Sequence, residues 1–346
     1  MKGSIIITGA NGGLGTSTVG QILQTPHLAS AYTGLYTVRK ATTATGIKKA
    51  LAKAASSNHR SEILELDLSS LESVRKFANS VNQRVATGEL PRIRALILNA
   101  GYQEHTTITM SKDGFEMTWQ VNYLSNVLLA LLLLQSMDPE HGRILLIGSW
   151  SHDVDDEFNK AGGYEPYADP KWQNLLPDLD ALAKGKWSTP DDDSSWYSGY
   201  RRYGASKLCA VMFQHELAHR IAQDPNLSNI RVLGLDPGGM ASDLGRRGDF
   251  VFHYVKMKFI MPLLGPFVVS RNPNGPFRTT AKSAKDVIRA CFEIEPPKGK
   301  PLYLNGSDEK AAAKETRDVA KMKLLWDYGN QAAGVKDGDT ILSNWR

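Results

Sequence analysis

The sequence predicts an α/β fold, in which one doubly wound parallel sheet of about seven strands is the middle of three layers, with helices on both faces. Short runs of β-branched and apolar residues alternate along the chain with longer stretches of helical periodicity, the pattern of repeated strand–helix units. The first run ends in a glycine-rich turn that leads directly into a helical pattern. No repeat or linker divides the chain, so residues 1–346 are predicted to form a single domain.

The composition is that of an ordinary globular protein with a mildly basic surface. Hydrophobic residues make up 42% of the chain and charged residues 22%, which allows a large core. The net charge is +5, but Lys and Arg are scattered without a long basic run, so we expect an anionic cofactor and no nucleic-acid partner. Cys209 and Cys291 lie in apolar helical patterns, which predicts buried free thiols rather than a disulfide or a metal site.

The N-terminal residues lack the pattern of a secretory signal. Met1 leads almost at once into an apolar strand pattern over residues 4–7, without a charged segment followed by a cleavable apolar one. The longest apolar run, residues 127–134, is shorter than the roughly 20 residues that span a bilayer. We therefore expect a cytoplasmic protein.

The glycine-rich turn after the first strand has the features of a dinucleotide site. Glycines let the backbone approach a pyrophosphate, and the free N–H groups of a helix N-terminus bind it. The strand covers residues 5–8 and the helix residues 16–23. The predicted cofactor-binding residues between them are Gly9, Asn11, Gly13, Leu14 and Gly15. The glycine spacing is G-x-x-x-G-x-G rather than the commoner G-x-G-x-x-G, and a purely structural turn is the alternative.

Two cations follow the second predicted strand, residues 34–38. That strand end normally faces the adenosine ribose, where an acidic residue would hydrogen-bond the 2′-hydroxyl group. Arg39 and Lys40 suit a 2′-phosphate instead, Arg39 as a planar fork and Lys40 as a point charge. The pair favours NADP(H) over NAD(H), with a solvated loop pair as the alternative.

The next two strands, residues 62–66 and 95–98, end in polar or small residues at the edge where α/β sheets bind ligands. Asp67 is expected to touch the adenine amino group, to cap the helix that begins near Ser70, or to do both. Small residues after the second of these strands let a cofactor pass close to the backbone. The predicted cofactor contacts here are Asp67, Leu68, Asn99, Ala100 and Gly101.

A tyrosine and a lysine four residues apart form the predicted acid–base pair. On a helix, Tyr203 and Lys207 lie on one face, one turn apart. A fixed ammonium favours the phenolate, so this Tyr would exchange a proton near neutral pH more readily than a free phenol with a pKa of about 10. Taken alone, the spacing also fits an exposed helix with a surface Lys.

Two other polar residues are candidates for the same site. Ser149 follows the fifth predicted strand and is a candidate for polarising a carbonyl group. Ser151 competes for that role, and His152 is expected to be structural. Asn122 lies in an otherwise apolar helical pattern, so it is either a hydrogen-bond hub or part of a proton path.

Taken together and in order, these motifs resemble those of the short-chain dehydrogenase/reductase family over residues 4–243. The residues that carry the resemblance are Thr8, Gly9, Gly13, Gly15, Asn99, Ala100, Gly101, Asn122, Ser149, Tyr203, Lys207, Pro237 and Gly238. It implies a Rossmann-like fold in which Tyr203 is the acid/base and Lys207 binds the nicotinamide ribose and lowers the pKa of Tyr203. It implies that Ser149 holds the substrate carbonyl and that Asn122 orders a water that relays protons. The further cofactor contacts that it implies are Tyr203, Lys207, Pro237, Gly238, Met240 and Ser242.

Two regions give the chain its individual character. The stretch between Ser149 and Tyr203 is much longer than in the family, and we interpret residues 151–199 as an inserted, lid-like excursion beside the active site. Residues 244–280 are the expected substrate-loop region, whose apolar and aromatic content predicts a bulky, apolar substrate. A packed or dimer-facing helix pair is the alternative. The insert and the segment around Ser149 are most similar to retinol-dehydrogenase-like and fungal secondary-metabolism reductases.

The last part of the chain is predicted to add one strand and one helix. Residues 299–304 would complete a seven-stranded parallel sheet. Residues 309–328 read as an amphipathic helix whose packing anchors are Leu324, Leu325 and Trp326.

The sequence thus predicts an NADP(H)-dependent carbonyl reductase or alcohol dehydrogenase for an aromatic, polyketide-like or lipid-like small molecule. Two alternatives stay open: a dehydratase, epimerase or cyclase on the same scaffold, and a catalytically silent NADP(H)-binding sensor. The cations interleaved in residues 246–269 leave open a weak contact with a membrane surface, and a homodimer is a further hypothesis.

Overall fold

One sheet runs through the centre of the molecule in this computed structural model, which describes residues 1–53, 58–160, 163–240, 244 and 261–346. Its strands are β1 (Gly3–Ile7), β2 (Tyr32–Val38), β3 (Ser61–Glu65), β4 (Ile93–Leu98), β5 (Arg143–Ile147), β6 (Arg231–Asp236), β7 (Leu302–Asn305) and β8 (Asp308–Glu309). They are ordered β3-β2-β1-β4-β5-β6-β7-β8, and all neighbours are parallel except β7 and β8.

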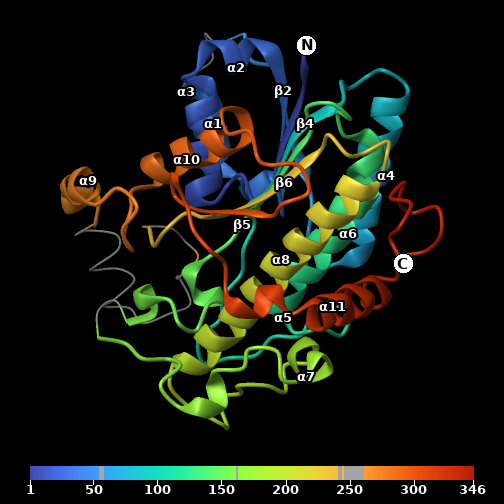
Figure 1. Cartoon of the computed structure of the whole chain (residues 1–346). Coiled ribbons are helices and arrows are strands. Elements are labelled where there is room, and N and C mark those ends of the chain that lie inside the picture. The colour runs from blue at the N-terminus through green and yellow to red at the C-terminus, as the bar shows by residue number, and fades with distance from the viewer. Residues whose placement is uncertain (54–57, 161–162, 241–243, 245–260) are drawn as a thin grey trace.

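Helices cover both faces of this sheet, as the sequence predicts (Figure 1). The α-helices are α1 (Gly13–Leu23), α2 (Pro26–Ala31), α3 (Thr45–Lys53), α4 (Leu71–Ala86), α5 (Met117–Trp119), α6 (Ser125–Leu133), α7 (Leu179–Ala183), α8 (Tyr197–Gln223), α9 (Met261–Arg271), α10 (Thr280–Phe292) and α11 (Val319–Ala332). Between them lie a π-helical turn, η2 (Gln120–Leu124), and the 3₁₀ turns η1 (Ala41–Thr43), η3 (Leu134–Ser136), η4 (Trp150–His152), η5 (Glu157–Lys160), η6 (Pro170–Trp172) and η9 (Lys314–Arg317).

Two hydrophobic clusters pack on opposite faces of the sheet. One lies beneath α1, α3 and α10, and the other beneath α4, α6, α8 and α11. Strands β1 and β5 are buried along their whole length, which is why they read as continuous apolar runs rather than alternating ones. Because β1 lies between β2 and β4, the chain reverses direction across the sheet there. The crevice at the carboxyl ends of these strands is where doubly wound sheets bind ligands.

The long apolar segment Met117–Ser136 is a helix of the core. By length and composition it is the one helix among the described residues that could cross a membrane, but 89% of it is buried inside the protein. The predicted run of residues 127–134 is thus part of a longer apolar helix, interrupted by the π-helical turn η2. Its packing between α4 and α8 accounts for its hydrophobicity without a bilayer.

The C-terminal region differs from the sequence prediction in two ways. The seven parallel strands are confirmed, but an eighth strand, β8, returns antiparallel to β7 after a tight turn in which Gly306 has a φ of 62°. The predicted helix over residues 309–328 begins instead at Val319, where the Asp318 side chain accepts a hydrogen bond from the Lys321 N–H group.

The packing face of α11 was predicted with one error. Leu325 and Trp326 are buried, with 1% and 3% of their surface exposed, whereas Leu324 is 60% exposed. The indole of Trp326 stacks on Phe213 of α8, with 5.7 Å between the ring centroids. Adjacent helical positions differ by about 100°, so three consecutive residues cannot all face the core.

We predict that Leu325→Ala destabilises the protein by about 2–5 kcal/mol, because it leaves a cavity under α11. The neighbouring substitution Leu324→Ala removes the same atoms from the surface and should change the free energy of unfolding by less than about 0.5 kcal/mol. Urea denaturation of both variants measures the difference. Equal shifts of the two midpoints would contradict this placement of the helix.

Candidate active site

The sequence-predicted site residues converge on one large cavity at the carboxyl ends of the parallel strands. Its volume is about 1080 Å³. All of the predicted residues in the described part of the chain line it except Asn122, and Ser242 lies outside the described residues. The predicted residues that line it are Gly9, Asn11, Gly13, Leu14, Gly15, Arg39, Lys40, Asp67, Leu68, Asn99, Ala100, Gly101, Ser149, Tyr203, Lys207, Pro237, Gly238 and Met240.

The glycine turn forms a cradle of backbone at one end of this cavity. Gly9 has a φ of 65°, and a Cβ there would lie 2.9 Å from the Ala100 Cα. A Cβ on Gly15 would lie 2.5 Å from the Gly9 carbonyl oxygen, so only glycine fits. The N-cap of α1 is Gly12, which has no side chain to satisfy the first N–H groups of the helix. Those groups therefore suit a pyrophosphate, whose size and charge fit a cradle without side chains.

Polar side chains hold the cradle to the neighbouring strand. The Asn99 Nδ2 donates a hydrogen bond to the Thr8 carbonyl at 2.7 Å, and the Thr8 Oγ1 accepts from the N–H groups of Asn99 and Ala100 at 2.9 Å. Asn11 is used in a similar way, because its Oδ1 accepts from the Ile47 N–H group at the start of α3. The side chains of Asn99 and Asn11 thus shape the cradle.

The end of β2 carries Arg39 and Lys40 at the edge of the cavity, and both are exposed.

The acidic residues after the adjacent strand β3 bind nearby N–H and hydroxyl groups. Glu65 accepts a hydrogen bond from the Ala41 backbone N–H group at 2.8 Å. Asp67 accepts from the N–H and hydroxyl groups of Ser69, and the cap of α4 is Ser70. The predicted capping role of Asp67 is therefore wrong, because the Ser70 side chain accepts the capping hydrogen bond from the Ser73 N–H group.

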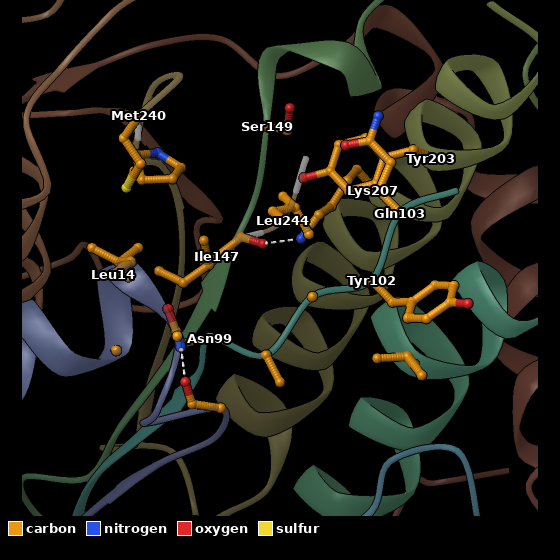
Figure 2. A pocket seen from close by; sticks show the side chains of 18 of the residues that line it. Leu14, Asn99, Tyr102, Gln103, Ile147, Ser149, Tyr203, Lys207, Met240 and Leu244 are labelled. Atoms are coloured by element: carbon orange, nitrogen blue, oxygen red, sulfur yellow. Dashed lines mark hydrogen bonds between the residues drawn. The ribbon is translucent and has the colours of Figure 1, made fainter. Parts of the chain in front are cut away.

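Tyr203 and Lys207 lie on one face of α8, and both side chains are buried. The Lys207 Nζ donates a hydrogen bond to the Ile147 carbonyl at 2.7 Å and lies 5.5 Å from the centroid of the Tyr203 ring. Figure 2 shows both side chains reaching from the helix toward the end of β5, where Ser149 lies. The predicted alternative, an exposed helix with a surface Lys, is therefore wrong.

Burial dominates the ionisation of this pair. It raises the pKa of Tyr203 above its ordinary value; the nearby Asp236 raises it further, and the hydrogen bond with Ser149 lowers it. Burial lowers the pKa of Lys207 to about 8, against the opposing charge of Asp236. The pKa of Tyr203 is therefore raised, whereas the prediction was that it is lowered. The reason is that the loss of solvation is the largest of these effects.

Asn122 is a hydrogen-bond hub behind the cavity. Its Oδ1 accepts from the Tyr102 N–H group at 2.8 Å, and its Nδ2 donates to the Tyr102 carbonyl and the Ser206 hydroxyl, both at 2.9 Å. Its backbone carbonyl, in the π-helical turn, accepts from the Asn126 Nδ2 at 3.0 Å. Asn122 thus holds the loop after β4 against α8, and the water relay implied by the resemblance stays a prediction.

The turn η4 orients Ser149. The buried Ser151 hydroxyl donates to the Ser149 Oγ at 2.9 Å, so Ser151 supports Ser149 rather than competing with it. The His152 Nδ1 hydrogen-bonds the Ser149 carbonyl at 2.7 Å, and its Nε2 accepts from the Ala313 N–H group. The structural role expected of His152 is confirmed, and burial lowers the pKa of its imidazole to about 4.

The structure adds an aromatic wall that the sequence analysis did not include. The side chains that form this wall line the same cavity as Ser149; they are Trp150, Phe158, Tyr164, Trp196 and Tyr200. A signal was available for two of them, because Trp196, Tyr200 and Tyr203 follow a spacing of four and three residues, which is one helix face. For Phe158 and Tyr164, which lie in irregular parts of the insert, no periodicity exists.

The insert is held to α8 by two buried arginines that directly precede Tyr203 in the sequence. Arg201 donates to the Ser188 hydroxyl at 2.8 Å, to the Pro166 carbonyl at 3.1 Å and to the Asp193 carboxylate at 2.5 Å. Arg202 donates to the carbonyls of Ser188 and Thr107. The described residues of the insert are therefore packed against α8, whereas the role of the insert as a lid stays a prediction.

Comparison with known proteins agrees with this architecture. The sequence profile of the family described as short chain dehydrogenase matches residues 4–161. The chain is 45% identical to the short-chain dehydrogenase iccH of Talaromyces variabilis over 99% of both chains, and 29% identical to retinol dehydrogenase 13 of Mus musculus over 80% of this chain and 70% of that one. Its fold is similar to that of the NADPH-bound carbonyl reductase from chicken fatty liver, with a TM-score of 0.56, 18% identity and coverage of 89% and 98%. The chain belongs to the short-chain dehydrogenase/reductase family.

Proposed function

We propose that the protein is an NADP(H)-dependent oxidoreductase that interconverts a carbonyl group and an alcohol on a bulky, apolar substrate. The observation that carries this proposal is that Ser149, Tyr203 and Lys207 line the same cavity as the glycine cradle. The site thus combines a place for a dinucleotide with a proton donor and a hydrogen-bond donor for an oxygen atom.

The cofactor assignment is supported by the fit of the cavity to its parts. The cradle of Gly9 and Gly15 suits the pyrophosphate, and the exposed cations Arg39 and Lys40 suit a 2′-phosphate. The carbonyl reductase from chicken fatty liver, which shares the fold, is an NADPH complex. When bound, NADPH supplies the hydride that reduces a carbonyl carbon.

Residues of the chain itself supply the proton and the hydrogen-bond donors for the reaction. Because burial raises its pKa, Tyr203 is protonated at neutral pH and can give its proton to a carbonyl oxygen as negative charge develops there. Ser149 accepts a hydrogen bond from Ser151, which leaves its own hydroxyl hydrogen for an oxygen acceptor in the cavity. The Lys207 ammonium offers two further N–H donors beyond the one used on Ile147, which suit the hydroxyl groups of a ribose.

The substrate class is supported by the lining of the remaining space. Trp150, Phe158, Trp196 and Tyr200 form an aromatic wall, and Leu244 and Phe277 lie on the same cavity. Side chains of this kind bind large apolar or aromatic molecules better than small polar ones. We expect consumption of NADPH with aromatic and lipid-like ketones and aldehydes. The same test separates reduction from the dehydratase, epimerase, cyclase and sensor alternatives.

We predict that Tyr203→Phe lowers kcat about 100- to 10,000-fold, because the proton donor is lost while the ring and its packing remain. NADPH affinity should stay within about twofold of wild type, as read from the change in nucleotide fluorescence on binding. The control is Tyr197→Phe, which removes a hydroxyl from the same helix at a site outside the cavity. Turnover at the wild-type rate in Tyr203→Phe would overturn the role of this residue.

We predict that Arg39→Ala weakens NADPH binding about 10- to 100-fold, because a charge-assisted contact to the 2′-phosphate is lost. NADH, which lacks that phosphate, should be affected little. The control Arg60→Ala removes an exposed cation from another part of the surface. An equal loss of affinity for NADPH and NADH would show that Arg39 does not bind the 2′-phosphate.

We predict that NADPH affinity falls as the pH rises through about 8, where burial places the pKa of Lys207. Below that pH the side chain is an ammonium that binds hydroxyl groups and anions, and above it this charge is lost. Lys207→Arg keeps its charge throughout the range and should flatten the profile, whatever its effect on affinity at neutral pH. Dissociation constants from about pH 7 to about pH 9.5 measure this. A profile of the same shape in both proteins would assign it to another group.

A further inference from the structure

The hydroxyl of Tyr167 connects the interior of the inserted segment, residues 151–199, back to its first residues in the turn η4, which holds Ser149. It donates a hydrogen bond of 2.9 Å to the Ser151 carbonyl, and both residues are buried. Ser151 in turn donates from its hydroxyl to the Ser149 Oγ at 2.9 Å and from its N–H group to the same atom at 3.3 Å. A continuous chain of hydrogen bonds therefore runs from the insert to the hydroxyl of Ser149.

We propose that Tyr167 is a positioning residue that holds Ser149 in register with Tyr203 by fixing the carbonyl of Ser151. This inference rests on the proposed function, in which Ser149 and Tyr203 act on the same oxygen atom. It assigns a catalytic purpose to the insert: the insert braces the serine turn, in addition to lining the cavity.

The helix α8, which carries Tyr203, packs directly against the hydrogen bond between Tyr167 and Ser151. Gly204 follows Tyr203, and a Cβ on it would lie 2.5 Å from the Ser151 carbonyl oxygen and closer still to the Tyr167 hydroxyl. The absence of a side chain there lets the Tyr167–Ser151 bond lie against the helix backbone next to Tyr203. The insert, the serine turn and the catalytic helix thus meet at one point.

Tyr167 is itself anchored by the catalytic helix. The residue before it, Pro166, accepts a hydrogen bond at 3.1 Å from Arg201, whose guanidinium also lies 4.2 Å from the centroid of the Trp172 ring. Burial raises the pKa of the Tyr167 hydroxyl, so it remains a donor at any working pH. Tyr167 is not among the described residues that line the cavity, and its ring lies 6.1 Å from that of Tyr200, between centroids. Because Tyr167→Phe keeps this ring contact, the effect of the hydroxyl is expected to pass through the Ser151 carbonyl.

The turn η4 has a second support on its other side. The His152 imidazole bridges the Ser149 carbonyl and the Ala313 N–H group, which anchors the turn to the chain after β8. With Tyr167 removed, that support keeps the turn folded but leaves the Ser151 carbonyl buried without its donor. Small shifts of a positioned group cost rate more than stability, because catalysis depends on distances to the reacting atoms.

The test is a double-mutant cycle between Tyr167→Phe and Ser149→Ala, measured in NADPH-dependent reduction of an aromatic ketone. We expect Tyr167→Phe to lower kcat about tenfold or more, with the NADPH dissociation constant unchanged. In the Ser149→Ala background the same substitution should have no further effect, because the group that it positions is gone. The matched control Tyr197→Phe removes the hydroxyl that accepts from the Glu165 N–H group in the same insert, and should leave kcat unchanged.

Gly204→Ala tests the contact from the side of the helix. The added methyl group should separate Tyr167 from Ser151 and lower kcat as Tyr167→Phe does, whereas Gly20→Ala in α1, where a Cβ meets no atom within 4 Å, should be neutral. Wild-type kcat in Tyr167→Phe or in Gly204→Ala overturns the inference, and so does an additional loss in the Ser149→Ala background. If Ser149→Ala and Tyr203→Phe themselves keep full turnover, the proposed function fails instead.

Discussion

The hydrogen bond from the Lys207 ammonium to the Ile147 carbonyl is the contact on which the arrangement of the site depends. It joins the middle of α8 to the last residue of β5, and so brings the helix that carries Tyr203 to the strand end that leads into Ser149. A buried ammonium is stable only with such a partner, and its pKa still falls to about 8. The same contact therefore holds the helix against the sheet and brings the three polar groups together.

The charged residues around this contact are few and buried. Asp236, at the end of β6, is buried; it raises the pKa of both Tyr203 and Lys207, and its own pKa is raised by burial. One of its oxygens accepts from the Gly238 N–H group, and its backbone carbonyl accepts from the fully buried Arg278. The strand end after β6 is thus braced by a guanidinium, as the insert is by Arg201. In both places a buried cation orders irregular backbone near the cavity.

Much of this arrangement could be predicted from the sequence, because local patterns carried the information. The apolar runs predicted seven parallel strands, and the glycine spacing predicted the cradle. The spacing of four residues on a helix predicted that Tyr203 and Lys207 lie together. Predictions failed where distant contacts decide. The net pKa shift of Tyr203 comes from burial, which no sequence window reports. For Asn122 the sequence left two roles open, a hydrogen-bond hub and a proton path, because its partners lie in the loop after β4 and in α8. Leu324 was misplaced because adjacent helical positions point about 100° apart, and only the packing of α11 on α8 shows which of the three faces the core.

The missing side chain at Gly204 has a consequence for how such chains can diverge. The insert can follow its path over α8 only while residue 204 has no side chain. Any larger residue would occupy the space of the hydrogen bond between Tyr167 and Ser151. A descendant that acquired alanine or serine there would have to reroute or shorten its excursion in the same lineage. The two features are therefore expected to be inherited together, and a glycine directly after Tyr203 would then be a marker for an insert that follows this path.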